Sequence, residues 1–144
     1  MLGAYGFVGG TCARLLAARG VPVLPLDKDD IDLMASGAAE QLQMRLAPDD
    51  AILVVSARAP CKDTGMMVDN IRIMHAVCTA LERSQPRRLF QLGRGLQRRA
   101  RPADRRIADR SPAPCTAPCN LARELMLKAT RPTNSQHSLL VSGA

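Results

Sequence analysis

Three glycines near the amino terminus constrain this chain more than any other feature. Gly3, Gly6 and Gly9 lie three residues apart, within the stretch Gly-Ala-Tyr-Gly-Phe-Val-Gly. Glycines at this spacing form a turn that lets the backbone come close to a pyrophosphate, and the helix that follows directs its free N–H groups at the phosphates. The stretch predicts a dinucleotide-binding turn, in which Phe7 and Val8 are also expected to bind the cofactor.

A turn of this kind follows a buried strand, and here only Met1 and Leu2 precede it. We therefore expect an α/β fold, a Rossmann-like doubly wound parallel sheet that is truncated at its first strand. The first strand lies at the centre of such a sheet, and each buried aliphatic side chain lost with it costs about 1.5–3 kcal/mol. Because typical stability is only about 5–15 kcal/mol, we expect a marginally folded or aggregating chain.

The charge of the chain is concentrated in one segment. Residues 87–110 hold nine arginines and two aspartates, which account for the whole formal net charge of +7. The remainder is neutral, so the basic character describes this segment alone. The length of 144 residues suits one domain, and the scarcity of aromatic residues predicts an aliphatic core.

The five cysteines have no spacing typical of a metal site, and neither histidine has partner ligands nearby. We favour reduced thiols over a disulfide or a zinc site. No apolar run approaches the ~20 residues that span a membrane, and no signal peptide precedes the glycines. These observations predict a cytoplasmic protein without a membrane or metal partner.

Apolar periodicity predicts alternating helices and strands. Gly20 is placed to end the first helix, and two prolines make the first strand more suitable for a sheet edge. The helices are expected over 10–19, 33–46, 66–82 and 121–128, and the strands over 21–26, 51–55, 89–92 and, as a short final strand, 139–141.

Polar side chains follow the predicted strands. Asp27 lies about 20 residues beyond the glycines, where a carboxylate binds the ribose hydroxyls. A carboxylate there would repel a 2′-phosphate, so NAD is favoured over NADP; the alternative is a solvated strand end. Ser56 and Ala57 follow a buried strand at the edge where such sheets bind ligands. Asn70 falls near the apolar face of its helix, as a site residue or as a hydrogen-bonding residue of the core.

This order of features resembles the extended short-chain dehydrogenase/reductase family, and more narrowly its NAD-dependent epimerase/dehydratase group, which acts on nucleotide sugars. The resemblance covers roughly residues 2–92 and resumes at 120–129. It implies NAD as cofactor, a nucleotide-sugar substrate and, for the intact family, allows a homodimer. The cofactor-binding residues that it implies are Gly3, Gly6, Phe7, Val8, Gly9, Asp27 for the ribose, Asp32 for the adenine, Ser56, Ala57 and, supporting the active site, Asn70.

The catalytic positions depart from the family. Gly93 and Arg94 stand where a serine pair is expected, and the Tyr-x-x-x-Lys positions hold Thr116 and Asn120. The sole tyrosine of the chain, Tyr5, lies in the glycine turn. Without the tyrosine base, general-base assistance worth about 10²–10⁴-fold is lost. The resemblance also implies that the C-terminal substrate region of the family is missing. We therefore assign no catalytic residue and expect an impaired enzyme.

The chain divides into a Rossmann-like core at 1–92, an irregular Arg/Pro-rich segment at 93–119, and a helix with a short strand at 120–144. One hypothesis explains the middle segment as coding sequence read out of frame. Two alternative functions remain. The chain could be a non-catalytic NAD-sensing regulator of a partner, or it could bind nucleic acid through arginines in 94–110, although no aromatic residues are interleaved there for base stacking.

Overall fold

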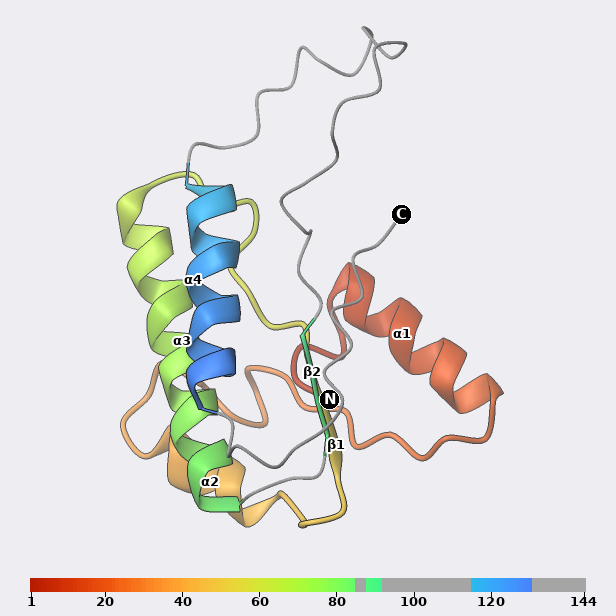
Figure 1. The fold of residues 1–144 in the computed structure, drawn as a ribbon. Coiled ribbons are helices and arrows are strands. Elements are labelled where there is room, and N and C mark those ends of the chain that lie inside the picture. Colours follow the sequence, from red (N-terminus) through yellow and green to blue (C-terminus); the bar gives the residue numbers. More distant parts are fainter. Residues whose placement is uncertain (85–87, 92–114, 131–144) are drawn as a thin grey trace, which may run out of the picture.

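The computed structural model describes residues 1–84, the backbone of 88–91, and 115–130. Its elements in chain order are α1 (Phe7–Ala18), α2 (Ala38–Met44), β1 (Ala51–Val54), α3 (Thr64–Ser84), β2 (Arg88–Gln91) and α4 (Thr116–Ala129). In Figure 1, α1 lies on one side of the strands, whereas α3 and α4 run together on the other side.

The helix after the glycine turn ends where the sequence predicts. Gly20 adopts a left-handed φ of 70° just beyond α1. Its N–H donates to the Ala17 carbonyl at 3.0 Å, and the Val21 N–H donates to the Leu16 carbonyl at 3.0 Å. These two bonds satisfy carbonyls that the last helical turn leaves open, and only glycine adopts this backbone conformation without strain.

Parallel pairing connects four segments of the chain. β1 and β2 are parallel, with Ala51 opposite Arg88 and Val54 opposite Gln91. Leu2 forms parallel bridges to both Leu26 and Val54. The short segment at the amino terminus therefore lies between the segment that ends at Leu26 and β1. The full doubly wound sheet stays a prediction beyond these pairings.

The segment 21–26 forms no strand, although its apolar residues predict one. Leu26 pairs through its bridge to Leu2 and through a bond from its N–H to the Met1 carbonyl at 2.9 Å, and the Met1 amino group donates to the Leu24 carbonyl at 2.7 Å. Pro22 and Pro25 lack the N–H that a strand on the outer side would need, which suits this segment to a sheet edge.

All four helices begin at residues other than those predicted. α1 begins at Phe7 rather than at 10, and α3 begins at Thr64 rather than at 66. α2 begins at Ala38 rather than at 33, because Gly37 precedes it with a left-handed φ of 80° that no α-helix continues. α4 begins at Thr116, inside the segment expected to be irregular up to 119. The remainder of that segment, residues 93–114, and the predicted strand at 139–141 lie outside the described residues.

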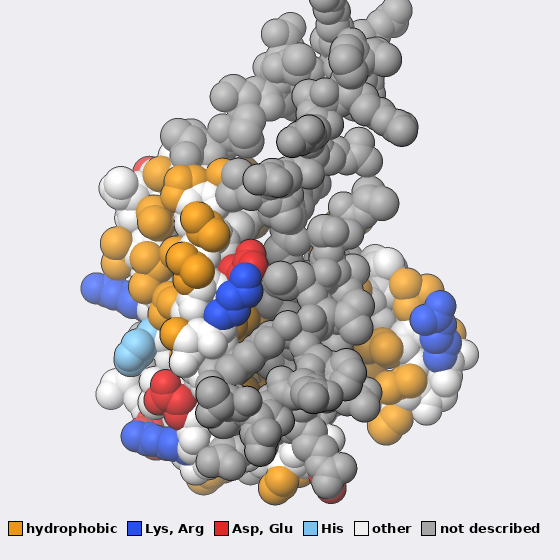
Figure 2. All heavy atoms as spheres, viewed as in Figure 1, with side chains coloured by type: hydrophobic (Ala, Val, Ile, Leu, Met, Phe, Trp, Pro, Cys, Tyr) orange, Lys and Arg blue, Asp and Glu red, His pale blue; other side chains and the backbone are white. Residues whose placement is uncertain are grey.

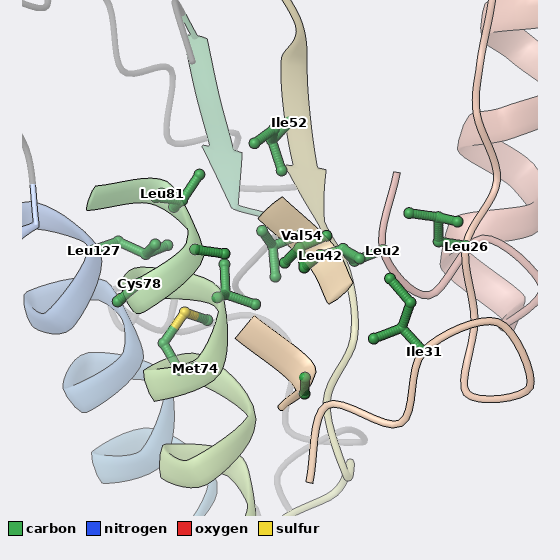
Figure 3. Close-up of a cluster of buried hydrophobic side chains, with 13 residues drawn as sticks. Leu2, Leu26, Ile31, Leu42, Ile52, Val54, Met74, Cys78, Leu81 and Leu127 are labelled. Atoms are coloured by element: carbon green, nitrogen blue, oxygen red, sulfur yellow. The ribbon is translucent and has the colours of Figure 1, made fainter. Parts of the chain in front are cut away.

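Aliphatic side chains from several elements form the core (Figure 3). Leu2 and Leu26 meet Ile52 and Val54 of β1, and this layer continues into α3 and to Leu127 of α4. The buried members contributed by α3 are Met74, Val77, Cys78, Ala80 and Leu81. The predicted aliphatic core is therefore present across the described residues.

Hydrophobic side chains are also exposed over α3 and α4 and over α1 (Figure 2). The exposed residues are Val68 on α3, Leu121 and Leu125 on α4, and Phe7, Val8 and Leu15 on α1. Of the α1 residues, only Gly9 is buried. Within the described part of the chain, no helix has the length and apolar character needed to cross a membrane.

Candidate functional site

Three segments reach the same edge of the paired strands. Gly3, Asp27 and Val55 directly follow the residues that pair, which are Leu2, Leu26 and Val54. Because the bridges are parallel, these three segments leave the strands in the same direction. Open α/β sheets bind ligands at this carboxyl edge, so the structure brings the glycine turn, Asp27 and the loop after β1 together there.

The glycine turn packs too closely for any side chain at two positions. A Cβ on Gly9 would lie 1.9 Å from the Gly3 carbonyl oxygen, well inside van der Waals contact. A Cβ on Gly3 would lie 2.8 Å from the Ser56 nitrogen, and its φ of 80° is left-handed. The first helical turn thus rests directly on the backbone of the preceding turn.

The amino-terminal end of α1 is open to solvent. Gly6 is the N-cap residue and has no side chain to accept from the first helical N–H groups. Phe7 is 94% exposed, and Val8 is exposed as well. The first N–H groups of a helix lack intrahelical partners, and together with the helix dipole they favour an anion at this end.

Both acidic candidates stabilise turns of their own backbone. The Asp27 Oδ1 atom accepts from the N–H groups of Asp29 at 2.9 Å and Asp30 at 3.4 Å. Asp32 Oδ1 accepts from the Met34 N–H at 3.0 Å. In the described residues no donor to the Asp27 Oδ2 atom is found, and Asp32 forms no hydrogen bond with the glycine turn. Asp27 therefore keeps one carboxylate oxygen, Oδ2, available at the strand end, where it could accept a hydrogen bond from a ribose hydroxyl.

A buried arginine on α4 holds the loop after β1 by a hydrogen bond. Arg123 of α4 is 2% exposed and donates from Nη2 to the Ser56 carbonyl at 2.7 Å. Its Nε atom is buried without a hydrogen-bond partner among the described residues. Burial lowers the pKa of this guanidinium, and the nearby Cys119 thiol opposes that shift. This hydrogen bond fixes the carbonyl of Ser56 and places a positive charge against the loop, at the residue before the exposed Ala57.

Asn70 of α3 holds the same loop from the side. The side chain is 1% exposed. Its Oδ1 atom accepts from the Arg58 N–H at 2.7 Å, and its Nδ2 donates to the Arg58 carbonyl at 3.0 Å. Both polar atoms are therefore engaged with one residue of the loop, and an ion pair between Arg58 and Asp69 adds a second link to α3.

Thr116 and Asn120, which the resemblance stated above aligns with a Tyr and a Lys, both lie on α4. Thr116 Oγ1 accepts from the Cys61 N–H at 3.2 Å and donates to the Cys61 carbonyl at 3.3 Å. The hydroxyl is thus engaged with the backbone of the loop. Asn120 is half-buried, and its side chain forms no hydrogen bond with the described residues. Neither residue supplies a general base.

The sequence reasoning missed Arg123 and the contact of Thr116 with Cys61. One signal was available for the arginine, since Cys119, Arg123 and Leu127 recur every fourth residue along one face of α4, and all three are buried. A charge on the apolar stripe of a helix needs a polar partner. That partner, Ser56, is 67 residues away in the sequence, so the stripe alone does not identify it.

The described residues contain no group of three or more histidine, cysteine or acidic side chains arranged to hold a metal ion. All five cysteines are free thiols in the structure. Comparisons of the chain with protein-family models, curated proteins and solved structures find no match.

Proposed function

We propose that this chain binds NAD as the cofactor domain of a nucleotide-sugar epimerase/dehydratase-like protein of the extended short-chain dehydrogenase/reductase type. One observation carries the proposal: the first turn of α1 rests on the Gly3 carbonyl with no room for a Cβ at Gly9. A backbone packed this closely leaves an uncapped helix end facing the position of a phosphate. Supporting it, Asp27 and Ser56 belong to segments that leave the strands at the same edge.

In this proposal the backbone of the glycine turn and of Phe7 and Val8 holds the pyrophosphate. The free Asp27 Oδ2 atom accepts from a ribose hydroxyl, and its negative charge disfavours the 2′-phosphate of NADP. Ser56 and Ala57 line the cofactor, while Asp32 serves the adenine. NAD would supply hydride transfer when bound. Asn70 and Arg123 act on the loop after β1, which they hold through Arg58 and Ser56.

A non-catalytic NAD-sensing role is the second candidate, and the environment of Thr116 favours it. The hydroxyl that stands at the position of the family's tyrosine is engaged by both backbone groups of Cys61. A threonine held this way offers no base for a sugar hydroxyl proton. We therefore propose that the chain binds NAD and, as it stands, is impaired in the family's chemistry. The arginines of segment 94–110, on which nucleic-acid binding would depend, lie outside the described residues.

The test is calorimetric titration of the full chain with NAD at low and at high salt. We expect saturable binding that salt changes little, and weaker binding of NADP. Gly9→Ala should weaken NAD binding by roughly ten-fold or more, which is about 1.4 kcal/mol, because its Cβ would overlap the Gly3 carbonyl. Gly10→Ala is the matched control: its Cβ would meet the nearest atom, the Ala4 carbonyl oxygen, at an ordinary 3.5 Å.

Circular dichroism on both variants separates a lost site from a lost fold. A chain that is folded and yet releases no heat with NAD would overturn the proposal. Equal affinities of the Gly9→Ala and Gly10→Ala chains would contradict the role given to the glycine turn. Steeply salt-dependent binding of a generic oligonucleotide, without binding of NAD, would favour the nucleic-acid alternative.

A further inference from the structure

Two buried cysteines lie where the loop after β1 meets α4. Cys61 belongs to that loop, Cys119 belongs to the first turns of α4, and each residue is 2% exposed. The Cys119 thiol is a close enough neighbour to perturb the Cys61 thiol directly. These positions are 58 residues apart in the sequence, so the contact is produced by the fold and not by local geometry.

Thr116 fixes the distance between the two backbones at this point. Its hydroxyl bonds to both the N–H and the carbonyl of Cys61, at 3.2 and 3.3 Å. Thr116 and Cys119 are three residues apart on α4 and therefore lie on the same face of the helix. The helix face that carries Cys119 is thus hydrogen-bonded to the Cys61 backbone. A disulfide requires two Cα atoms about 4.4–6.8 Å apart.

We propose that Cys61 and Cys119 form a reversible disulfide that links the loop after β1 to α4. The oxidant is a small-molecule disulfide such as oxidised glutathione. One cysteine thiolate attacks it, forms a mixed disulfide and releases one glutathione thiolate. The second cysteine thiolate then attacks the mixed disulfide and releases the other. Two protein thiols are oxidised, one glutathione disulfide is reduced, and the protons of the protein thiols pass to the two glutathione thiolates.

The surroundings of the pair control how fast it reacts. Burial raises the pKa of the Cys61 thiol, and the Cys119 thiol raises it further; Asn70 opposes this shift, and the Asp63 carboxylate makes the smallest contribution. Arg123 is the cation that faces Cys119. Only the thiolate attacks a disulfide, and both thiols are buried. The exchange therefore requires local opening of the loop from α4, and it is expected to be slow at neutral pH and faster above roughly pH 9, past the ordinary cysteine pKa.

The linked loop is the one that the candidate NAD site uses. α4 already contacts it at both ends, through Thr116 at Cys61 and through Arg123 at Ser56. A disulfide at Cys61 would restrain the segment between them and thereby alter how it receives a ligand. This consequence for NAD rests on the proposed function, whereas the disulfide itself does not.

The experiment is peptide mapping of the full native chain after exposure to oxidised glutathione, alkylation of the remaining thiols and trypsin digestion. Trypsin places Cys61 in peptide 59–62, and both Cys115 and Cys119 in peptide 111–123. We expect these two peptides to be recovered as a linked pair that a reductant separates. Cys119→Ser should abolish the link. Cys115→Ser, in the same peptide, is the matched control and should retain it.

A parallel oxidation in concentrated urea shows whether the fold selects this pair. The native chain should yield predominantly the 61–119 link, and the unfolded chain a mixture that also involves Cys12, Cys78 and Cys115. The proposal is overturned if the native and unfolded patterns agree, or if the link survives in Cys119→Ser. Titration of the oxidised and reduced chains with NAD then distinguishes the two proposals, since a disulfide that forms while neither chain binds NAD would count against the cofactor site alone.

Discussion

Asp27 serves the backbone and the candidate ligand with different oxygens of one carboxylate. Its Oδ1 atom accepts from the N–H groups of Asp29 and Asp30 and closes the turn after Leu26. The sequence leaves two interpretations open for Asp27, a ribose ligand or a solvated strand end. The hydrogen bonds show that Oδ1 stabilises the turn at the strand end, and they leave Oδ2 for a ligand. The two roles are compatible, because the turn needs only an acceptor atom, whereas binding of the ribose also needs the negative charge.

Asp27→Asn separates these roles, since the amide retains an acceptor for the turn and loses the negative charge. A hydrogen bond to a charged group is worth about 1.5–3 kcal/mol against about 0.5–1.5 for a neutral one. We therefore expect NAD affinity to fall by roughly five- to ten-fold, with a smaller preference over NADP and little change in the unfolding midpoint. Calorimetric titration with NAD and with NADP measures the two affinities. Asp29→Asn, in the same turn and with the same change in net charge, should leave both affinities unaltered.

At the scale of elements, helices were predictable wherever apolar residues recur and a local signal ends the repeat. α1 and α3 follow their periodicity, and Gly20 marks the end of the first. Periodicity cannot detect that Gly37 takes a left-handed φ, which delays α2. Nor can periodicity detect the hydrogen bond between Thr116 and Cys61, which are 55 residues apart in the sequence. This bond lies at the start of α4, four residues before Asn120.

The candidate site follows the same division. The glycine turn and Asp27 are local in sequence and were predicted by spacing alone. The support of the loop after β1 comes instead from Asn70 and Arg123, whose partners are 12 and 67 residues away. For Asn70 the sequence could only offer a site residue or a hydrogen-bonding core residue. The hydrogen bonds to Arg58 fulfil the second interpretation, and its part in the site is proposed through the loop that it holds.

Removing the amide of Asn70 should loosen this loop from α3. Asn70→Leu leaves the Arg58 N–H and carbonyl without their partners, and an unsatisfied buried group costs about 1–3 kcal/mol. We expect the free energy of unfolding in urea to fall by about 2 kcal/mol, and the Arg58 amide to lose its protection from hydrogen exchange. Asp69→Asn removes only the ion pair to the Arg58 side chain, which is half-exposed; it should cost under about 1 kcal/mol and leave that amide protected. Equal effects of the two substitutions would contradict the positioning role.

At the scale of the whole molecule, the two sides of the paired strands are packed unequally. α3 contributes many of the buried side chains and α4 adds Leu127, whereas α1 buries only Gly9 and leaves Leu15 exposed. The glycine turn is therefore attached to the core chiefly through Leu2, Ala4 and the backbone bonds around them. The candidate cofactor site therefore gains little stability from the packing of α1, and a ligand bound there would add to it.

We accordingly expect low thermal stability that NAD increases. Mesophilic domains unfold at about 45–65 °C, and we expect the full chain at or below the lower limit. NAD at a hundred-fold excess over its Kd adds about 2.7 kcal/mol, which for a chain of this size raises the midpoint by roughly 10 °C. Scanning calorimetry with and without NAD measures both quantities. The Gly9→Ala chain should show no such rise. A cooperative transition above the mesophilic range without NAD would contradict the weak packing of α1 as the limit on stability, and an unchanged midpoint at saturating NAD would count against the cofactor site.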